Sequence, residues 1–113
     1  MVRRAMQIKL TTTGRNSGRD RTATLYGWED GEDILVVGSW AGRDRDPDWA
    51  GNLRAAPKAT VTMGKETFAV TARELSGAAR GPAWELVVEC FPMYASYQRK
   101  TTRQIPVFAL KRR

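Results

Sequence analysis

The feature that most constrains the fold of this chain is a set of short segments in which apolar and polar residues alternate. A period of two places every second side chain on one face, as in a half-buried β-strand. The run from Ile34 to Gly38 is instead continuously apolar, which is typical of a short strand buried on both faces. The predicted strands are Met6 to Thr12, Arg21 to Trp28, Ile34 to Gly38, Lys58 to Met63, Glu66 to Glu74 and Pro106 to Leu110.

Glycine turns and one helix signal separate these strands. Asp30-Gly31 and Gly64-Lys65 predict two tight antiparallel hairpins. Between the hairpins, a short helix is predicted to have Asp46 as its N-cap and Pro47 as its first residue, and to end before Pro57.

The C-terminal third of the chain changes period from two to that of a helix. Pro82 is predicted to mark the first turn of a second helix that ends at Pro92. A third, short helix is predicted from Pro92 to about Lys100, and a basic tail, Lys111 to Arg113, follows the last strand.

These elements predict one mainly β (α+β) domain over residues 1–113. A chain of 113 residues is too short for two cores of ordinary size, and no linker or repeat divides it. Its connections are too short for parallel crossovers, and no GxGxxG motif favours a dinucleotide-binding fold. We therefore expect a small antiparallel barrel, closed or split, with short helical insertions.

Composition excludes several kinds of chemistry. The absence of histidine removes the Ser-His-Asp triad and the usual zinc, iron and haem sites, so no metal site is expected. Cys90 is the only cysteine, which leaves no intrachain disulfide and favours a reducing compartment. No apolar run reaches the ~20 residues of a membrane helix, and no secretory signal is visible, so a cytoplasmic protein is predicted.

The charge balance predicts an anionic partner. Nineteen Lys and Arg residues face twelve Asp and Glu residues, for a net charge of +7. Nucleic acid, a phosphorylated cofactor and acidic lipid all fit that charge.

The densest constellation of polar residues lies between Thr11 and Arg21. Gly14 and Gly18 permit positive φ angles that turn backbone N–H groups toward an anion, while Arg15, Arg19 and Arg21 add charge. This pattern is consistent with an anion site, and equally with an arginine-rich hairpin turn.

Several motifs together resemble the deazaflavin (F420)-dependent nitroreductase and F420H2-dependent quinone reductase family. The resemblance covers nearly the whole chain. It is carried by Leu10 to Gly18 with Arg21, by Pro47, Trp49, Asn52, Leu53, Ala55, Pro57 and Val61, by Val70 to Glu74, and by Tyr94, Tyr97, Arg103, Ile105 and Pro106.

The resemblance implies a split β-barrel, FMN-binding-like, that binds coenzyme F420 and passes a hydride to a quinone, nitroaromatic or activated enone. FMN in place of F420 is a less favoured variant. The phosphate and oligoglutamate tail of F420 agree with an arginine-rich chain. The family also implies a small aromatic or quinone acceptor and leaves open a homo-oligomer and a peripheral position at the inner face of the membrane.

The resemblance also implies roles for particular residues. The residues implied to bind the cofactor are Thr11, Arg15, Asn16, Ser17, Gly18, Arg21, Val37, Gly38, Ser39, Trp40 and Tyr94. The residues implied to bind the acceptor are Tyr26, Phe91, Tyr94 and Tyr97, and the catalytic donors are Tyr97, Ser39 and Tyr26.

Three positions depart from the family pattern. Asn16 stands where lysine is usual, Trp40 where a smaller or cationic residue is commoner, and Phe91 where a tyrosine is usual. They favour one alternative, a non-catalytic barrel that binds F420, FMN or another anionic ligand. A second alternative is a basic small barrel that binds nucleic acid, although the cations cluster at one turn and the termini rather than along the strands. No nucleic-acid partner is therefore expected.

Overall fold

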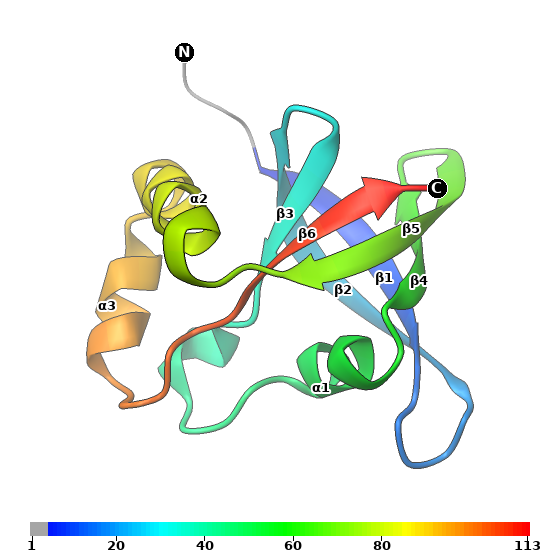
Figure 1. The fold of residues 1–113 in the computed structure, drawn as a ribbon, viewed down its shortest axis with the longest axis horizontal. Coiled ribbons are helices and arrows are strands. Elements are labelled where there is room, and N and C mark those ends of the chain that lie inside the picture. Colours follow the sequence, from blue (N-terminus) through cyan, green and yellow to red (C-terminus); the bar gives the residue numbers. More distant parts are fainter. Residues whose placement is uncertain (1–4) are drawn as a thin grey trace.

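The computed structural model describes residues 5–113, and antiparallel strands form its centre (Figure 1). The strands are β1 (Met6–Thr13), β2 (Asp20–Asp30), β3 (Asp33–Val37), β4 (Lys58–Met63), β5 (Glu66–Glu74) and β6 (Val107–Arg112). The helical elements are the 3₁₀ turn η1 (Trp40–Gly42) and the helices α1 (Asp48–Ala55), α2 (Gly77–Cys90) and α3 (Met93–Arg99).

The strands close into a barrel in the order β1-β2-β3-β6-β5-β4. Both predicted hairpins, β2-β3 and β4-β5, are present and antiparallel. The barrel closes where β1 pairs with β4, with Leu10 opposite Val61. The prediction of a mainly β, antiparallel small barrel with short helical insertions is confirmed.

The inside of the barrel forms the first of two hydrophobic clusters. Its buried members come from β1, β3, β4, β5 and β6, and β2 adds the half-buried Leu25. Helix α1 adds Ala50 and Leu53 at the lower end of the barrel (Figure 1). Trp49 of α1 meets Phe108 edge-on at a centroid distance of 5.8 Å. The helix therefore closes one end of the barrel, as the apolar residues of the predicted first helix require.

The second cluster lies outside the barrel, where α2 and α3 cover β3 and β6 (Figure 1). Leu35 and Val37 point into this cluster, whereas Ile34 and Val36 point into the barrel. The predicted burial of the third strand on both faces is confirmed, because none of these four side chains is more than 8% exposed.

Two helix starts differ from prediction. Pro47, not Asp46, is the N-cap of α1, because the Asp46 carboxylate is drawn away into ion pairs with Arg54 and Arg103. The second helix begins at Gly77, so Pro82 lies inside it rather than in its first turn. Between Glu74 and Pro82 the sequence has no apolar periodicity, so the proline alone was used to place the start of the helix.

The predicted basic tail is also different. Lys111 and Arg112 belong to β6, and the Arg113 N–H donates to the Ala69 carbonyl at 2.9 Å. Arg112 forms a two-bond ion pair with Glu66, at 2.9 and 3.2 Å. These residues continue the strand because Thr71 and Val70 of β5 pair with Lys111 and Arg112.

An ion-pair chain ties β5 to α1 and to the loop before it. The Arg54 guanidinium donates two hydrogen bonds of 2.8 Å to the Glu74 carboxylate and one of 2.6 Å to Asp46. The hydrogen bonds from Arg54 lower the pKa of Glu74 below its ordinary value of 4.5, against the opposing effect of partial burial. Charged Glu74 therefore stabilises the folded chain.

Replacing Glu74 with glutamine should remove an acid-sensitive part of the stability. Because the folded pKa is lowered, this contribution is present above the unfolded value of 4.5 and is lost as the pH falls through the lower folded value. Urea denaturation should find the wild type more stable than Glu74→Gln at neutral pH, with the difference vanishing in acid. Glu85→Gln, at an exposed position of α2, is the control and should show no such difference. A constant difference at all pH values would contradict the ion pair.

Candidate functional site

The glycine-framed turn between β1 and β2 folds back on itself. The Gly14 N–H donates to the Arg19 carbonyl at 2.7 Å, and the Gly18 N–H donates to the Gly14 carbonyl at 2.8 Å. Gly18 has the predicted positive φ, at 72°, whereas Gly14 is not in this region. Ser17 Oγ accepts a hydrogen bond from the Arg19 N–H at 3.2 Å, which leaves the hydroxyl proton of Ser17 to donate elsewhere.

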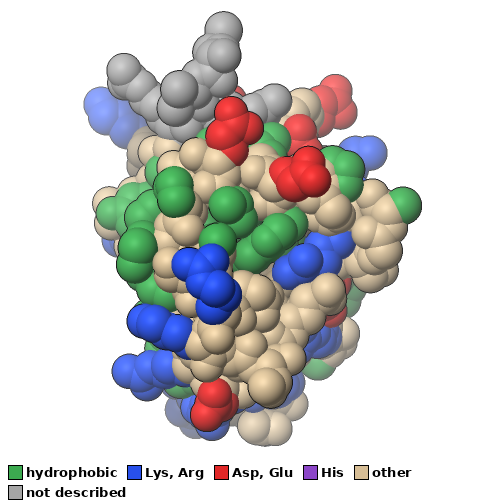
Figure 2. Space-filling model, turned by 90° about the vertical axis from the view of Figure 1, so that its left-hand side faces the viewer, with side chains coloured by type: hydrophobic (Ala, Val, Ile, Leu, Met, Phe, Trp, Pro, Cys, Tyr) green, Lys and Arg blue, Asp and Glu red, His purple; other side chains and the backbone are tan. Residues whose placement is uncertain are grey.

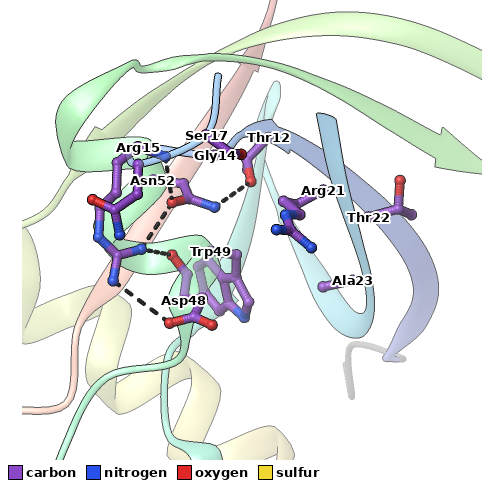
Figure 3. Close-up of a pocket in the computed structure, with 11 residues that line it drawn as sticks. Thr12, Gly14, Arg15, Ser17, Arg21, Thr22, Ala23, Asp48, Trp49 and Asn52 are labelled. Carbon is purple, nitrogen blue, oxygen red and sulfur yellow. Dashed lines mark hydrogen bonds and ion pairs between the residues drawn. The ribbon is translucent and has the colours of Figure 1, made fainter. Parts of the chain in front are cut away.

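A pocket of about 420 Å³ lies between this turn, the start of β2 and α1 (Figure 3). Polar and cationic groups line it on the side of the turn, and Trp49 and Ala23 add apolar surface. The lining residues are Thr12, Gly14, Arg15, Asn16, Ser17, Arg21, Thr22, Ala23, Asp48, Trp49 and Asn52. The structure thus brings four of the predicted cofactor residues, Arg15, Asn16, Ser17 and Arg21, to one pocket.

The side chain of Asn52 joins the turn to the barrel and to α1. Its Nδ2 donates to the Thr12 hydroxyl at 3.1 Å, and its Oδ1 accepts from the Arg15 N–H at 3.1 Å and from Arg15 Nη1 at 2.8 Å (Figure 3). Asn52 is 3% exposed and Thr12 is 1% exposed, so the bond between them forms out of water, where an unpaired amide is costly. The two bonds to Arg15 are partly buried. Asn52 therefore fixes the shape of the turn.

The two pocket arginines are held very differently. Arg15 lies against α1 at Gly51, where a Cβ atom would come within 2.9 Å of its Cζ. Its Nη1 also donates to the Asp48 carbonyl at 3.0 Å, and Nη2 lies 3.5 Å from the Asp48 carboxylate. Arg21 is exposed and has no ion pair within residues 5–113. Arg15 is thus partly a structural clamp, and Arg21 is the cation free to meet a ligand.

The segment predicted to line the cofactor ring does not share this pocket. Val37 and Gly38 are buried at the end of β3, and Ser39 and Trp40 are half-buried at the start of η1. Two guanidinium groups stack on the Trp40 ring, from Arg43 at 4.7 Å and from Arg45 at 5.2 Å. The segment lies along α3, on the far side of α1 from the glycine turn (Figure 1).

The predicted acceptor residues form most of an aromatic cluster on α3 and its neighbours. Tyr94 is its centre, with Phe91 at 4.9 Å, Trp28 at 5.5 Å and Tyr97 at 6.3 Å between ring centroids. Burial, with a smaller effect of Tyr97, raises the pKa of the Tyr94 phenol well above its usual range. Tyr94 therefore stays protonated and acts as packing, while Tyr97 is the half-buried phenol of the cluster.

Exposed apolar side chains continue from this cluster to the surface. Phe91 is 38% exposed and Met93 is 45% exposed, at the junction of α2 and α3. Figure 2 shows hydrophobic side chains across the middle of this face, with Lys and Arg side chains beside and below them.

Two predicted residues stand apart from both groups. Tyr26 is 56% exposed on β2, two residues before Trp28 and on the same outer face of the strand. Thr11 does not line the pocket, although its hydroxyl lies 2.9 Å from that of Thr22, which does.

Sequence reasoning from the residues assigned no functional role to Asn52, Asp48 or Arg103, and gave Asp48 only a place in the first turn of a helix. Asn52 and Arg103 appeared only as matches to the family pattern. Asn52 could have been found from its place on the buried face of the short helix α1, because a buried amide needs hydrogen-bond partners.

The fold and the pocket together define a closed antiparallel β-barrel with a candidate anion-binding site beside one end. The sequence profile of the F420H(2)-dependent quinone reductase family matches residues 2–112, and the chain belongs to this family.

Relatives and solved structures agree with this assignment. The chain is 37% identical over 109 residues to an F420H(2)-dependent quinone reductase of Mycobacterium tuberculosis, covering 94% of this chain and 73% of the relative. It is 40% identical to the F420-H2 dependent reductase FDR-A, with a TM-score of 0.83 and 93% of each chain covered. A structure described as a domain-swapped dimer is 40% identical, with a TM-score of 0.84, and the match covers 93% of this chain and 79% of the chain in that structure.

More distant structures share the fold alone. The haem storage protein HutZ of Vibrio cholerae is 15% identical, with a TM-score of 0.68 over 96% of this chain and 82% of its own. Within residues 5–113, no helix has both the length and the apolar character needed to cross a membrane. The same residues contain no cluster of three or more acidic or cysteine side chains suited to a metal ion.

Replacing Asn52 with alanine should destabilise the fold by about 1–3 kcal/mol, the cost of leaving buried hydrogen-bond partners unpaired. The Thr12 hydroxyl and the Arg15 N–H would both lose their partner. Chemical denaturation measures the change. Asn16→Ala is the matched control, because Asn16 is exposed in the same turn, and its effect should stay within about 0.5 kcal/mol. Equal effects of the two substitutions would show that Asn52 does not brace the turn.

Proposed function

We propose that this chain is an F420H2-dependent quinone reductase whose glycine-turn pocket holds the anionic part of the coenzyme. The observation that carries the proposal is the pocket beside α1, where a preformed turn, a free guanidinium and a free hydroxyl donor converge. A phosphate or carboxylate is the ligand that this donor set suits best.

The residues present fit the charged part of F420. Arg21 offers a planar fork that has no ion pair among the described residues, and the Ser17 hydroxyl retains its proton for donation. Arg15 keeps its Nε and part of Nη2 for a ligand, although Nη1 is used by α1. The lysine usual at the position of Asn16 is replaced here by an exposed amide, so Arg21 carries more of the charge recognition.

When bound in its reduced form, F420 supplies a hydride. Reduction of a quinone to a hydroquinone consumes that hydride and one proton, so a proton donor of the chain is expected near the acceptor oxygen. The Tyr97 phenol is the proposed donor, with its proton restored from water, and the Ser39 hydroxyl is a second donor beside η1.

The aromatic cluster gives the acceptor a surface on which to lie. Phe91 and Tyr97 have rings whose centroids are 6.4 Å apart, and Phe91 is partly exposed. A planar quinone or nitroaromatic stacks on such rings and keeps water away from the reacting atoms. The proposal also includes Tyr26 as a residue that binds the acceptor and donates a proton to it. It further includes the segment from Val37 to Trp40 as the lining of the deazaflavin ring.

Cytoplasmic location and assembly into a homo-oligomer also remain proposals. A structural relative described as a domain-swapped dimer supports the second of them. The anion-binding pocket also allows FMN as a weaker ligand, so FMN belongs in every binding assay as a competitor.

Replacing Arg21 with glutamine should weaken F420 binding by roughly 10- to 100-fold, the value of a charge-assisted hydrogen bond lost from a ligand site. Arg19→Gln removes the same charge from the same turn but outside the pocket, and should change the affinity less than about threefold. Fluorescence titration of oxidised F420, with FMN and a short oligonucleotide as alternative ligands, measures both. Equal losses in the two variants would refute a specific role for the pocket.

Replacing Tyr97 with phenylalanine should lower kcat by about tenfold or more, since a positioned proton donor contributes at least that much, with little change in F420 affinity. Steady-state reduction of a soluble quinone by F420H2 gives kcat and KM. Tyr94→Phe, in the same cluster but buried, should keep most of the turnover. If Tyr97→Phe turned over like the wild type, Tyr97 would be assigned to packing.

A further inference from the structure

The segment between β3 and α1 contains a run of unfavourable backbone conformations. Trp40, Ala41 and Gly42 have φ angles of 43°, 55° and 80°, all in the left-handed region. Among residues 5–113, Trp40 and Ala41 are the only non-glycine residues with positive φ. Side chains with a Cβ atom disfavour this region, so the conformation persists only where the surrounding structure holds it.

This segment packs directly against α3 at Tyr97. A Cβ atom on Gly42 would lie 2.8 Å from the Tyr97 carbonyl oxygen and 3.1 Å from its Cα. The backbone of η1 therefore sets how closely α3 approaches the barrel at Tyr97.

Arg103 supplies the contacts that hold the segment. Its Nη2 donates to the Ser39 carbonyl at 2.8 Å and its Nε to the Arg43 carbonyl at 2.9 Å. Its Nη1 donates to the Gly38 carbonyl at 3.2 Å and to Asp46 Oδ1 at 2.7 Å. The guanidinium thus bonds both ends of the left-handed run, and its side chain is only 15% exposed.

Arg103 is itself anchored to α3. Gln98 Nε2 donates to the Arg103 carbonyl at 2.7 Å, and Gln98 Oε1 accepts from the Ile105 N–H at 2.9 Å. The contacts form a closed circuit from α3 through Arg103 to η1, and from Gly42 back to α3 at Tyr97.

We propose that Arg103 is a positioning residue that keeps the Trp40–Gly42 segment in its left-handed shape and thereby fixes Tyr97 and Ser39 for the reaction. The catalytic part of this inference rests on the proposed function, whereas the holding of the segment does not. The four acceptors lie around one planar guanidinium, so lysine, with its donors on a single nitrogen, cannot replace it.

Hydrogen exchange of single amides tests directly whether Arg103 holds the Trp40–Gly42 segment in place. The Gly42 N–H donates to the Ser39 carbonyl at 2.9 Å, and the Arg43 N–H donates to the Trp40 carbonyl at 3.1 Å. In Arg103→Lys these two amides should exchange at least about tenfold faster, with the Gly14 and Gly18 amides unchanged, because only the local opening energy falls.

Arg54→Lys is the matched control. Arg54 is the other arginine bonded to Asp46, at 2.6 Å, and it makes no bond to the segment's carbonyls. This variant should lower the global stability while leaving exchange at Gly42 and Arg43 unchanged relative to the rest of the barrel. Asp46→Asn retains Arg103 and its three carbonyl bonds, and should open the segment less than Arg103→Lys does.

Kinetics then separates positioning from binding. Arg103→Lys should lower kcat for quinone reduction by about tenfold and weaken F420 binding less than that, because the glycine-turn pocket that would hold the anionic part of the coenzyme is untouched. Unchanged exchange at Gly42 and Arg43 in Arg103→Lys, or faster exchange throughout the barrel, would overturn the inference. A wild type that binds no F420 would instead refute the proposed function, and the exchange result would still decide whether Arg103 holds the segment.

Discussion

The buried amide of Asn52 is the interaction on which the candidate cofactor pocket depends. It bonds a strand hydroxyl at Thr12, the backbone and the side chain of Arg15, and it belongs to the helix that closes one end of the barrel. A small barrel of this size has little interior to spare for a ligand. The pocket is therefore built outside the core, between the closing helix and a turn that the amide holds in place.

The arginines of the chain serve two purposes: some stabilise the fold through ion pairs, and others are available to bind a ligand. Arg54, Arg103 and Arg112 form short ion pairs that tie strands, loops and α1 together. Arg21 has no such partner within the described residues and faces the pocket. Three of the nineteen Lys and Arg residues are thus engaged in short ion pairs, and the place of Arg21 in the pocket says more about function than the number of cations does.

Much of the fold was predictable, because alternation and glycine turns act locally. The antiparallel hairpins and the doubly buried β3 followed from patterns of neighbouring residues. The errors came from tertiary contacts. Asp46 has the sequence signature of a helix cap, yet its carboxylate binds Arg54 of α1 and Arg103, which is far away in the chain. Strand β6 extends through Lys111 and Arg112 because β5 pairs with them. The site followed the same rule: the glycine turn was visible in the sequence, whereas the bracing by Asn52 and Arg103 joins residues far apart in the chain.

The most direct test of the central claim is a titration of ¹⁵N-labelled protein with F420, followed by the chemical shifts of assigned backbone amides. The account predicts saturable shifts at the amides of the turn from Gly14 to Arg19, at Arg21 and at Asn52, with further shifts at Ser39 and Trp40. Shifts confined to the pocket at the other end of the barrel, which Gly31, Glu32 and Lys111 line, or no saturable shifts at all, would contradict it.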